Sequence, residues 1–212
     1  MTHVRPIDSD RIHDRAAPEL GNNARAFVRW RAEALIEAGS NRAILARNDL
    51  DDTNIVAAWA QKHAQDAAIN SSSERFVGLF DDNDSMMGAI ESAPATTRQF
   101  APYESPLDLL FKRRTIKPDA NDLAILALLA EKNEGRLGVM VDLLRHTVNK
   151  HAMDPKVIYF GVPTDSAAHD AALAEHFEPQ GKTAKLFGVY HTLVAREVGV
   201  NDANTLIDSE VE

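Results

Sequence analysis

The chain has 212 residues, a hydrophobic fraction of 44% and no cysteine. This length and apolar content fit one globular domain with its own core, and the lack of cysteine excludes disulfides, thiolate metal sites and a cysteine nucleophile. The formal net charge of −9 argues against nucleic acid or an anionic membrane as a partner, because both attract basic proteins. No apolar run resembles a signal peptide or reaches membrane-spanning length, so we expect a cytoplasmic protein.

The first third of the chain predicts one strand followed by helices. Phe27 and Trp30 share the apolar face of the clearest helix, which Gly39 is expected to end. The expected elements are a short edge strand over residues 2–7, a helix capped at 8–10, a turn at 21–23, an amphipathic helix over 24–38 and a further helix capped at 51–54.

Two apolar segments on either side of an acidic turn predict a β-hairpin. Its strands are residues 75–80 and 86–91, and its turn is 81–84. The turn lacks the glycine and the distal glutamate of a calcium loop, so we expect no calcium site. Residues 92–105 are expected to form a loop, and the alternating apolar side chains of 106–112 predict a further strand.

The central stretch reads as strand, turn, helix and strand. Leu123–Ala130 is an unbroken apolar run, typical of a strand covered on both faces. A turn containing Gly135 and Gly138 follows, and apolar residues then fall at helical spacing over 139–150. With the apolar strand 157–162, these segments predict one right-handed βαβ unit.

The turn before this helix is a candidate anion site. Backbone N–H groups at a helix start lack intrahelical partners and carry the positive end of the helix dipole, about half a charge. A phosphate or pyrophosphate is therefore a natural ligand, and a glycine lets it approach the main chain. The same pattern also fits an ordinary structural turn, or an unrelated α/β domain that binds a nucleotide or sugar phosphate. The last of these requires strictly alternating parallel strands, against which the predicted hairpin argues.

The carboxyl-terminal part predicts one more helix and a final strand. The helix is capped at 163–166 and runs to about residue 176, and the strand covers 186–195 with a bulge at Gly188. The expected organisation is a single domain over residues 1–198, including a helical segment at 24–70, and a flexible acidic tail at 199–212.

This order of elements resembles the GCN5-related N-acetyltransferase (GNAT) superfamily, whose acyl-CoA turn reads Q/R-x-x-G-x-G/A. Residues 133–138, Asn-Glu-Gly-Arg-Leu-Gly, match its last glycine. Asn133 stands where Gln or Arg is usual, and Arg136 replaces the middle glycine, as in an Arg-Leu-Gly version of the turn. Downstream, residues 177–181 resemble the family's G-F-E-P-x-G segment, and 166–169 resemble the small-residue start of the preceding helix.

The resemblance implies an α/β fold with a mixed, mostly antiparallel sheet, a splayed parallel central pair and helices on both faces. It implies acetyl-CoA as co-substrate and no metal. The backbone amides of residues 136–139 would cradle the pyrophosphate, and the backbone of residues 128–130 in the central strand would pair with the pantetheine. The binding residues it implies are Leu128, Leu129, Ala130, Asn133, Glu134, Gly135, Arg136, Leu137, Gly138, Val139 and Ser166.

The candidate catalytic residues follow the family pattern less closely. Many members carry a tyrosine as general acid on the helix before the Phe-Glu-Pro segment, where this chain has Ala172. The family's base is often a carboxylate early in the central strand, and Asp122 lies near that place but one residue out of register. Glu91 on the hairpin, and Tyr190 and His191 on the last strand, are further candidates for acid or base.

The resemblance favours an N-acetyltransferase that moves an acetyl group from acetyl-CoA to a primary amine by direct attack. The acceptor would be a small molecule or a peptide, and the protein a monomer or homodimer without nucleic-acid or membrane partners. The alternative is a catalytically inactive domain of the same fold, either acyl-CoA-binding or purely structural. The missing tyrosine and the replaced middle glycine motivate that alternative.

Overall fold

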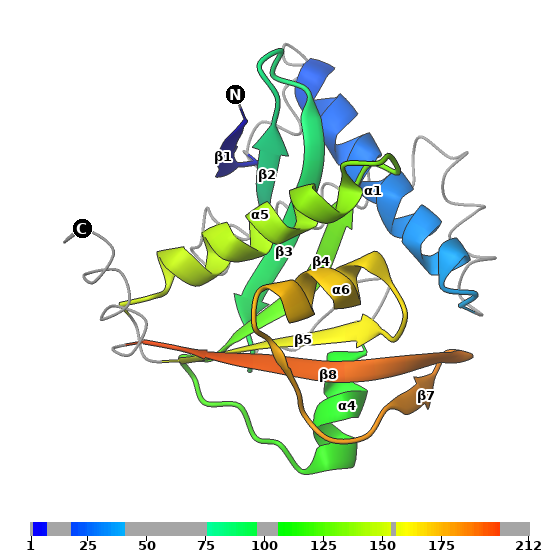
Figure 1. Ribbon diagram of the computed structural model, residues 1–212, viewed down its shortest axis with the longest axis vertical. Helices are drawn as coiled ribbons and strands as arrows, with labels where there is room; N and C mark the ends of the chain where they lie inside the picture. Colours follow the sequence, from blue (N-terminus) through cyan, green and yellow to red (C-terminus); the bar gives the residue numbers. More distant parts are fainter. Residues whose placement is uncertain (1, 8–17, 41–75, 97–105, 154–155, 200–212) are drawn as a thin grey trace.

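The protein is described by a computed structural model, in which one mixed sheet is covered by helices (Figure 1). The structure describes residues 2–7, 18–40, 76–96, 106–153 and 156–199. The strands are β1 (His3–Pro6), β2 (Phe76–Phe80), β3 (Met86–Pro94), β4 (Leu123–Ala130), β5 (Lys156–Pro163), β6 (Glu178–Pro179), β7 (Ala184–Leu186) and β8 (Val189–Val198). The helices are α1 (Pro18–Glu37), α4 (Leu107–Arg114), α5 (Arg136–Lys150) and α6 (Ala167–Ala174).

The sheet follows the order β1-β2-β3-β4-β5-β8-β6, with β7 paired to β8. Among these strands only β4 and β5 pair in parallel, and the remaining pairs are antiparallel. β1 lies at one edge, as its proline predicted. The hairpin of β2 and β3 and the βαβ unit of β4, α5 and β5 are likewise confirmed.

Helices cover both faces of the sheet. α5 and α6 pack in one buried cluster with Ile125 and Leu128 of β4. α1 packs on Ala127 and Leu129, and α4 packs beside Leu126, so both cover the opposite face (Figure 1). The predicted fold class, a mostly antiparallel sheet with one parallel central pair between two helical layers, is confirmed.

A β-bulge bends β4 in its middle. On β3, Glu91 pairs with Ala127 but Ser92 pairs with Ile125, so Leu126 is an extra residue on β4. A bulge of this kind kinks its strand and increases the local twist. The end of β4 therefore turns away from the direction in which the strand began.

The close packing of α5 on the hairpin depends on Gly88 of β3. A Cβ atom at Gly88 would lie 2.5 Å from Cγ1 of Val139 and 2.9 Å from the carbonyl oxygen of Leu129. Only glycine leaves room for this approach. The first turn of α5 is consequently held against the end of β4.

The prediction of a strand over 106–112 is wrong, because these residues form α4. Leu107 and Leu110 are fully buried and Phe111 is nearly so, whereas Leu109 is 36% exposed. Residues three and four apart share a helix face, and this spacing outweighs the apparent alternation. The expected loop at 92–105 also begins later, since β3 continues to Pro94.

Two other boundaries differ from the prediction. α1 begins at Pro18 and runs through the expected turn at 21–23, with proline at the first helical position, where its fixed φ suits a helix start. The final strand is divided into β7 and β8, because Phe187 (φ 53°) and Gly188 (φ 86°) form a two-residue turn rather than a bulge. Positive φ at both positions is typical of the type I′ hairpin turn.

Several predictions lie outside the described residues. These are the cap at 8–10, the helix capped at 51–54, most of the loop at 92–105 and nearly all of the tail at 199–212. The extent of the domain, residues 1–198, stays a prediction. Within the described ranges, none of the helices combines the length and the apolar character needed to cross a membrane.

Candidate functional site

The two parallel strands separate at their carboxyl ends and leave a gap. β4 and β5 pair only from Leu123 with Ile158 to Ile125 with Phe160. The pairing stops immediately before the bulge, while β5 stays paired with β8 as far as Pro163. Among the described strands, none therefore pairs with residues 126–130 on the β5 side, and the predicted splay is confirmed.

A cavity of about 420 Å³ occupies this gap. β4 contributes residues 126–129 and β5 contributes 160–163. Met140 of α5 lines it from one face of the sheet, and Ala34 of α1 lines it from the other. The cavity thus passes through the sheet and is accessible to groups from both helical layers.

The turn before α5 leaves two backbone donors unsatisfied. Asn133 organises the turn, because its side-chain Oδ1 accepts from the amide of Gly135 at 3.0 Å and its carbonyl accepts from the amide of Arg136 at 3.1 Å. The amide of Val139 donates to the carbonyl of Gly135. The amides of Leu137 and Gly138 have no hydrogen-bond acceptor within the described part of the chain.

The space beside these donors suits an anion. A Cβ atom placed on Gly138 would meet no heavy atom within 4 Å from the described residues beyond its own helix turn and chain neighbours. α6 also begins at the cavity, where Ala167 and Ala168 line the wall and Ser166 caps the helix by accepting from the amide of His169 at 3.2 Å. The positive ends of two helix dipoles thus meet at one cavity, which favours a phosphate or diphosphate there.

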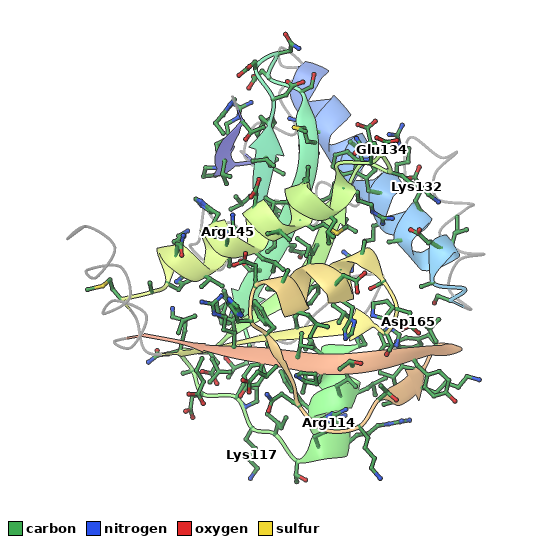
Figure 2. All side chains as sticks on the ribbon, viewed as in Figure 1. Arg114, Lys117, Lys132, Glu134, Arg145 and Asp165 are labelled. Carbon is green, nitrogen blue, oxygen red and sulfur yellow. The ribbon has the colours of Figure 1, made fainter. Side chains whose placement is uncertain are left out.

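Charged side chains from two elements meet beside the turn. Nη1 of Arg136 donates to Oε2 of Glu37 at 2.6 Å, and Nζ of Lys132 lies 3.8 Å from Oε1 of the same carboxylate. The Arg136 hydrogen bond lowers the pKa of Glu37, against the opposing effect of burial. Figure 2 shows Lys132 with Glu134 in the turn and Asp165 before α6. Two cations, Arg136 and Lys132, therefore lie beside the turn, and both contact the Glu37 carboxylate.

Comparisons with known proteins find the same fold among solved structures. No protein-family model matches the sequence, and a search of curated proteins finds no sequence relative. Among solved structures, an N-acetyltransferase from Staphylococcus aureus Mu50 superposes with a TM-score of 0.58 at 12% identity, over 92% of this chain and 100% of that one. A GNAT superfamily phosphinothricin acetyltransferase from Sinorhizobium meliloti, in complex with acetyl-CoA, gives 0.56 at 12% identity over 93% and 89%. The protein yncA from Salmonella typhimurium, with its cofactor acetyl-CoA, gives 0.51 at 11% over 93% and 94%.

This chain has the GNAT fold. At these identities the likeness concerns the fold, and the roles of individual residues have to be argued from their own surroundings. The chain spans nearly the whole length of each of these three structures.

Some of the residues that we predicted to bind acetyl-CoA lie at the gap between β4 and β5. Residues 133–139 form the turn and the start of α5. Four of the predicted binding residues line the cavity itself, namely Leu128, Leu129, Arg136 and Ser166.

Asp122 lies at the far end of β4 from the gap. Its Oδ2 accepts from the amide of Asp119 at 2.8 Å, and its Oδ1 accepts from the amide of Val157 at 2.9 Å. At the usual strand rise, about 13 Å of β4 separates it from Leu126. The carboxylate joins the starts of the two central strands and does not line the cavity.

Glu91 is fully buried beside the gap. Its Oε2 lies 3.4 Å from Nη1 of Arg31, which comes from α1 and lines the cavity. Glu91 pairs with Ala127, the residue that follows the bulge. This carboxylate therefore holds a cavity-lining arginine in place, although it does not line the cavity itself.

The two candidates on β8 have different surroundings. Tyr190 is 57% exposed, its ring lies 5.7 Å from Nζ of Lys185, and it does not line the cavity. His191 is buried and does line it. Ala172 of α6, at the position where the family often has tyrosine, is fully buried in the core. In the described ranges, no three acidic or histidine side chains gather as a metal site would require.

Proposed function

We propose that this protein is an acyltransferase that moves an acetyl group from acetyl-CoA to a primary amine. The observation that carries the proposal is the presence of two features beside one cavity, whose wall includes Arg136 at the start of α5. One is the open backbone edge where β4 leaves β5, and the other is the pair of amides of Leu137 and Gly138 that have no acceptor in the described part of the chain.

The residues present fit acetyl-CoA. The amides of Leu137 and Gly138 would donate to the diphosphate, with the Arg136 side chain nearby. The free edge of β4 at residues 128–130 would pair with the amide groups of the pantetheine, as an added strand does. Acetyl-CoA would supply the activated acetyl group, and the gap would hold its thioester.

The amine acceptor would enter from the α1 and α4 face. The cavity continues through the sheet to that face, so an acceptor there meets the thioester without crossing the diphosphate site. Holding the two reactants together supplies a large share of the acceleration, since well-oriented reactions reach effective concentrations of about 10⁵–10⁸ M. We propose a small molecule or a peptide as the acceptor.

A binding-only role is the second candidate, and one observation favours it. Ala172 is fully buried and has no ionisable group, so the family's frequent tyrosine acid has no counterpart at that place. Direct attack by an amine does not require this acid, because a thiolate is an adequate leaving group. The two candidates therefore differ in turnover and not in acetyl-CoA binding.

Calorimetry and thiol release test the proposal together. Acetyl-CoA titrated into the protein is expected to release or absorb heat, and pantetheine, which lacks the diphosphate, is expected to bind at least about tenfold more weakly, as loss of one or more charged hydrogen bonds requires. Thiol release from acetyl-CoA is then followed with a broad panel of primary amines. The absence of binding at millimolar acetyl-CoA would refute both candidates, whereas binding without thiol release would favour the second.

A further inference from the structure

His191 of β8 lines the cavity on the face of the sheet that α1 and α4 cover. In the sheet it pairs with Pro163 of β5 and with Ala184 of β7. Leu193, two residues along β8, packs in the cluster that contains Leu110 of α4. Because side chains alternate along a strand, His191 faces the same side as Leu193, which is the α1 and α4 side.

The hydrogen bond of the imidazole determines which nitrogen is available. Nδ1 lies 3.1 Å from the carbonyl oxygen of Val189. A carbonyl only accepts, so Nδ1 must carry the proton and Nε2 must carry the lone pair in the neutral ring. Burial lowers the pKa of His191 below its ordinary value of 6.5, and the bond to Val189 opposes this in part. At pH 7 the ring is therefore neutral.

The other charged groups that line the cavity are poor proton acceptors. Arg31 and Arg136 carry guanidinium groups, which donate hydrogen bonds and offer no acceptor. Glu37 already accepts a short hydrogen bond from Arg136. Asp165 lies in the loop before α6, the helix that packs with α5 on the face of the sheet opposite α1 and α4. This leaves His191 as the neutral base among the described ionisable residues of the lining.

On this face of the sheet, α1 brings Arg31 and Glu37 to the cavity wall, while α4 and β7 bring apolar side chains. α4 presents Leu107 and Leu110, and β7 presents Ala184. Tyr159, which titrates above its ordinary range because burial raises its pKa, lies earlier on β5 against Phe111. The protonation of His191 is thus governed by its burial and by Val189.

We propose that His191 is the general base of the transfer and accepts a proton from the attacking amine through Nε2. The inference rests on the proposed acetyl transfer. In this step the amine nitrogen forms a bond to the acetyl carbon and the carbon–sulfur bond breaks. The nitrogen loses one proton to Nε2, and the thiolate takes one proton from solvent. The imidazolium then returns its proton to solvent, so the base is restored.

The test compares His191→Gln with His3→Gln, a matched change on the edge strand β1, far from the gap. With the best amine of the panel, His191→Gln is expected to lower kcat/KM at pH 7 by about 10²- to 10⁴-fold, the usual contribution of a general base. Its Kd for acetyl-CoA is expected to change by less than about twofold, since the base lies outside the diphosphate site. His3→Gln is expected to leave both values unchanged.

Two readouts separate a base from a structural residue. In the wild type, kcat/KM should fall as the pH drops through a value below 6.5, and this acid limb should be absent from His191→Gln. The ¹⁵N chemical shifts of the His191 ring at pH 7 should show a protonated Nδ1 and an unprotonated Nε2.

The outcomes distinguish the role of His191 from the proposed function. Wild-type transfer with an unaffected His191→Gln rate, or a ring protonated at Nε2, would overturn the role of His191 and leave acetyl transfer standing. Absence of acetyl-CoA binding or transfer by the wild type would overturn the proposed function, and the role of His191 with it. A large loss of rate with intact acetyl-CoA binding and a lost acid limb would support both.

Discussion

Replacing Gly138 by alanine should make the unliganded protein more stable and its complex with CoA weaker. Gly138 is a helical residue, and a Cβ atom added to it would lie more than 4 Å from the described residues beyond its own helix turn and chain neighbours, so alanine clashes with none of these. Alanine is favoured over glycine in a helix by about 0.5–1 kcal/mol, which is the expected gain in the free energy of unfolding. The gain should appear in urea unfolding of the free protein.

The same methyl group would occupy the space through which a diphosphate reaches the amide of Gly138. A hydrogen bond to a charged group is worth about 1.5–3 kcal/mol, so the Kd for CoA should rise by about 10- to 150-fold in calorimetry. The control is Asn149→Ala at the exposed last turn of α5, which also favours the helix but lies at its other end. An unchanged Kd in Gly138→Ala, or an equal rise in the control, would refute the assignment of this turn.

Three further changes test the packing and charge pattern around the gap. Leu110→Ala should lower the free energy of unfolding by about 2–5 kcal/mol, because it removes a fully buried side chain. Leu109→Ala should change it by less than about 0.5 kcal/mol, because Leu109 is exposed. Equal costs for the two variants would contradict the helical face of α4. Arg31→Met should lower the free energy of unfolding in urea by about 3–5 kcal/mol, because it removes one half of the buried ion pair with Glu91. The double variant Arg31→Met/Glu91→Leu should recover most of this loss. Equal losses in the single and double variants would rule out that explanation. The Arg136 hydrogen bond lowers the pKa of Glu37 below 4.5, so its stabilising effect is complete above that value and disappears as the pH falls through the lowered pKa. The free energy of unfolding should therefore fall less for Glu37→Gln than for the wild type as the pH is lowered. Parallel plots of this free energy against pH would show that the contact contributes nothing.

Local signals were sufficient for the central βαβ unit. The apolar run Leu123–Ala130 and the helical spacing after Gly138 predicted β4 and α5 with the observed boundaries to within a few residues. They were not sufficient for α4, because Leu109 is apolar but exposed and made a helical pattern look like alternation. Nor did one glycine distinguish a bulge from a turn, since the φ of Phe187 also had to be positive.

The candidate site depends on pairings between distant segments, which local patterns do not contain. The gap exists because Leu126 is an extra residue against β3, and that register is set by contacts across the sheet. Asp122 resembled a base by its place in the sequence, but two backbone amides occupy its carboxylate. His191 was one of several candidates, and only its pairing with Pro163 brings it to the gap.

A crystal structure of the protein with bound CoA would show whether the turn before α5 and the edge of β4 hold this ligand. We predict diphosphate oxygens within hydrogen-bond distance of the amide nitrogens of Leu137 and Gly138, and pantetheine amides paired with the free edge of residues 128–130. CoA bound elsewhere, or a diphosphate held only by side chains with the edge of β4 left empty, would contradict this prediction.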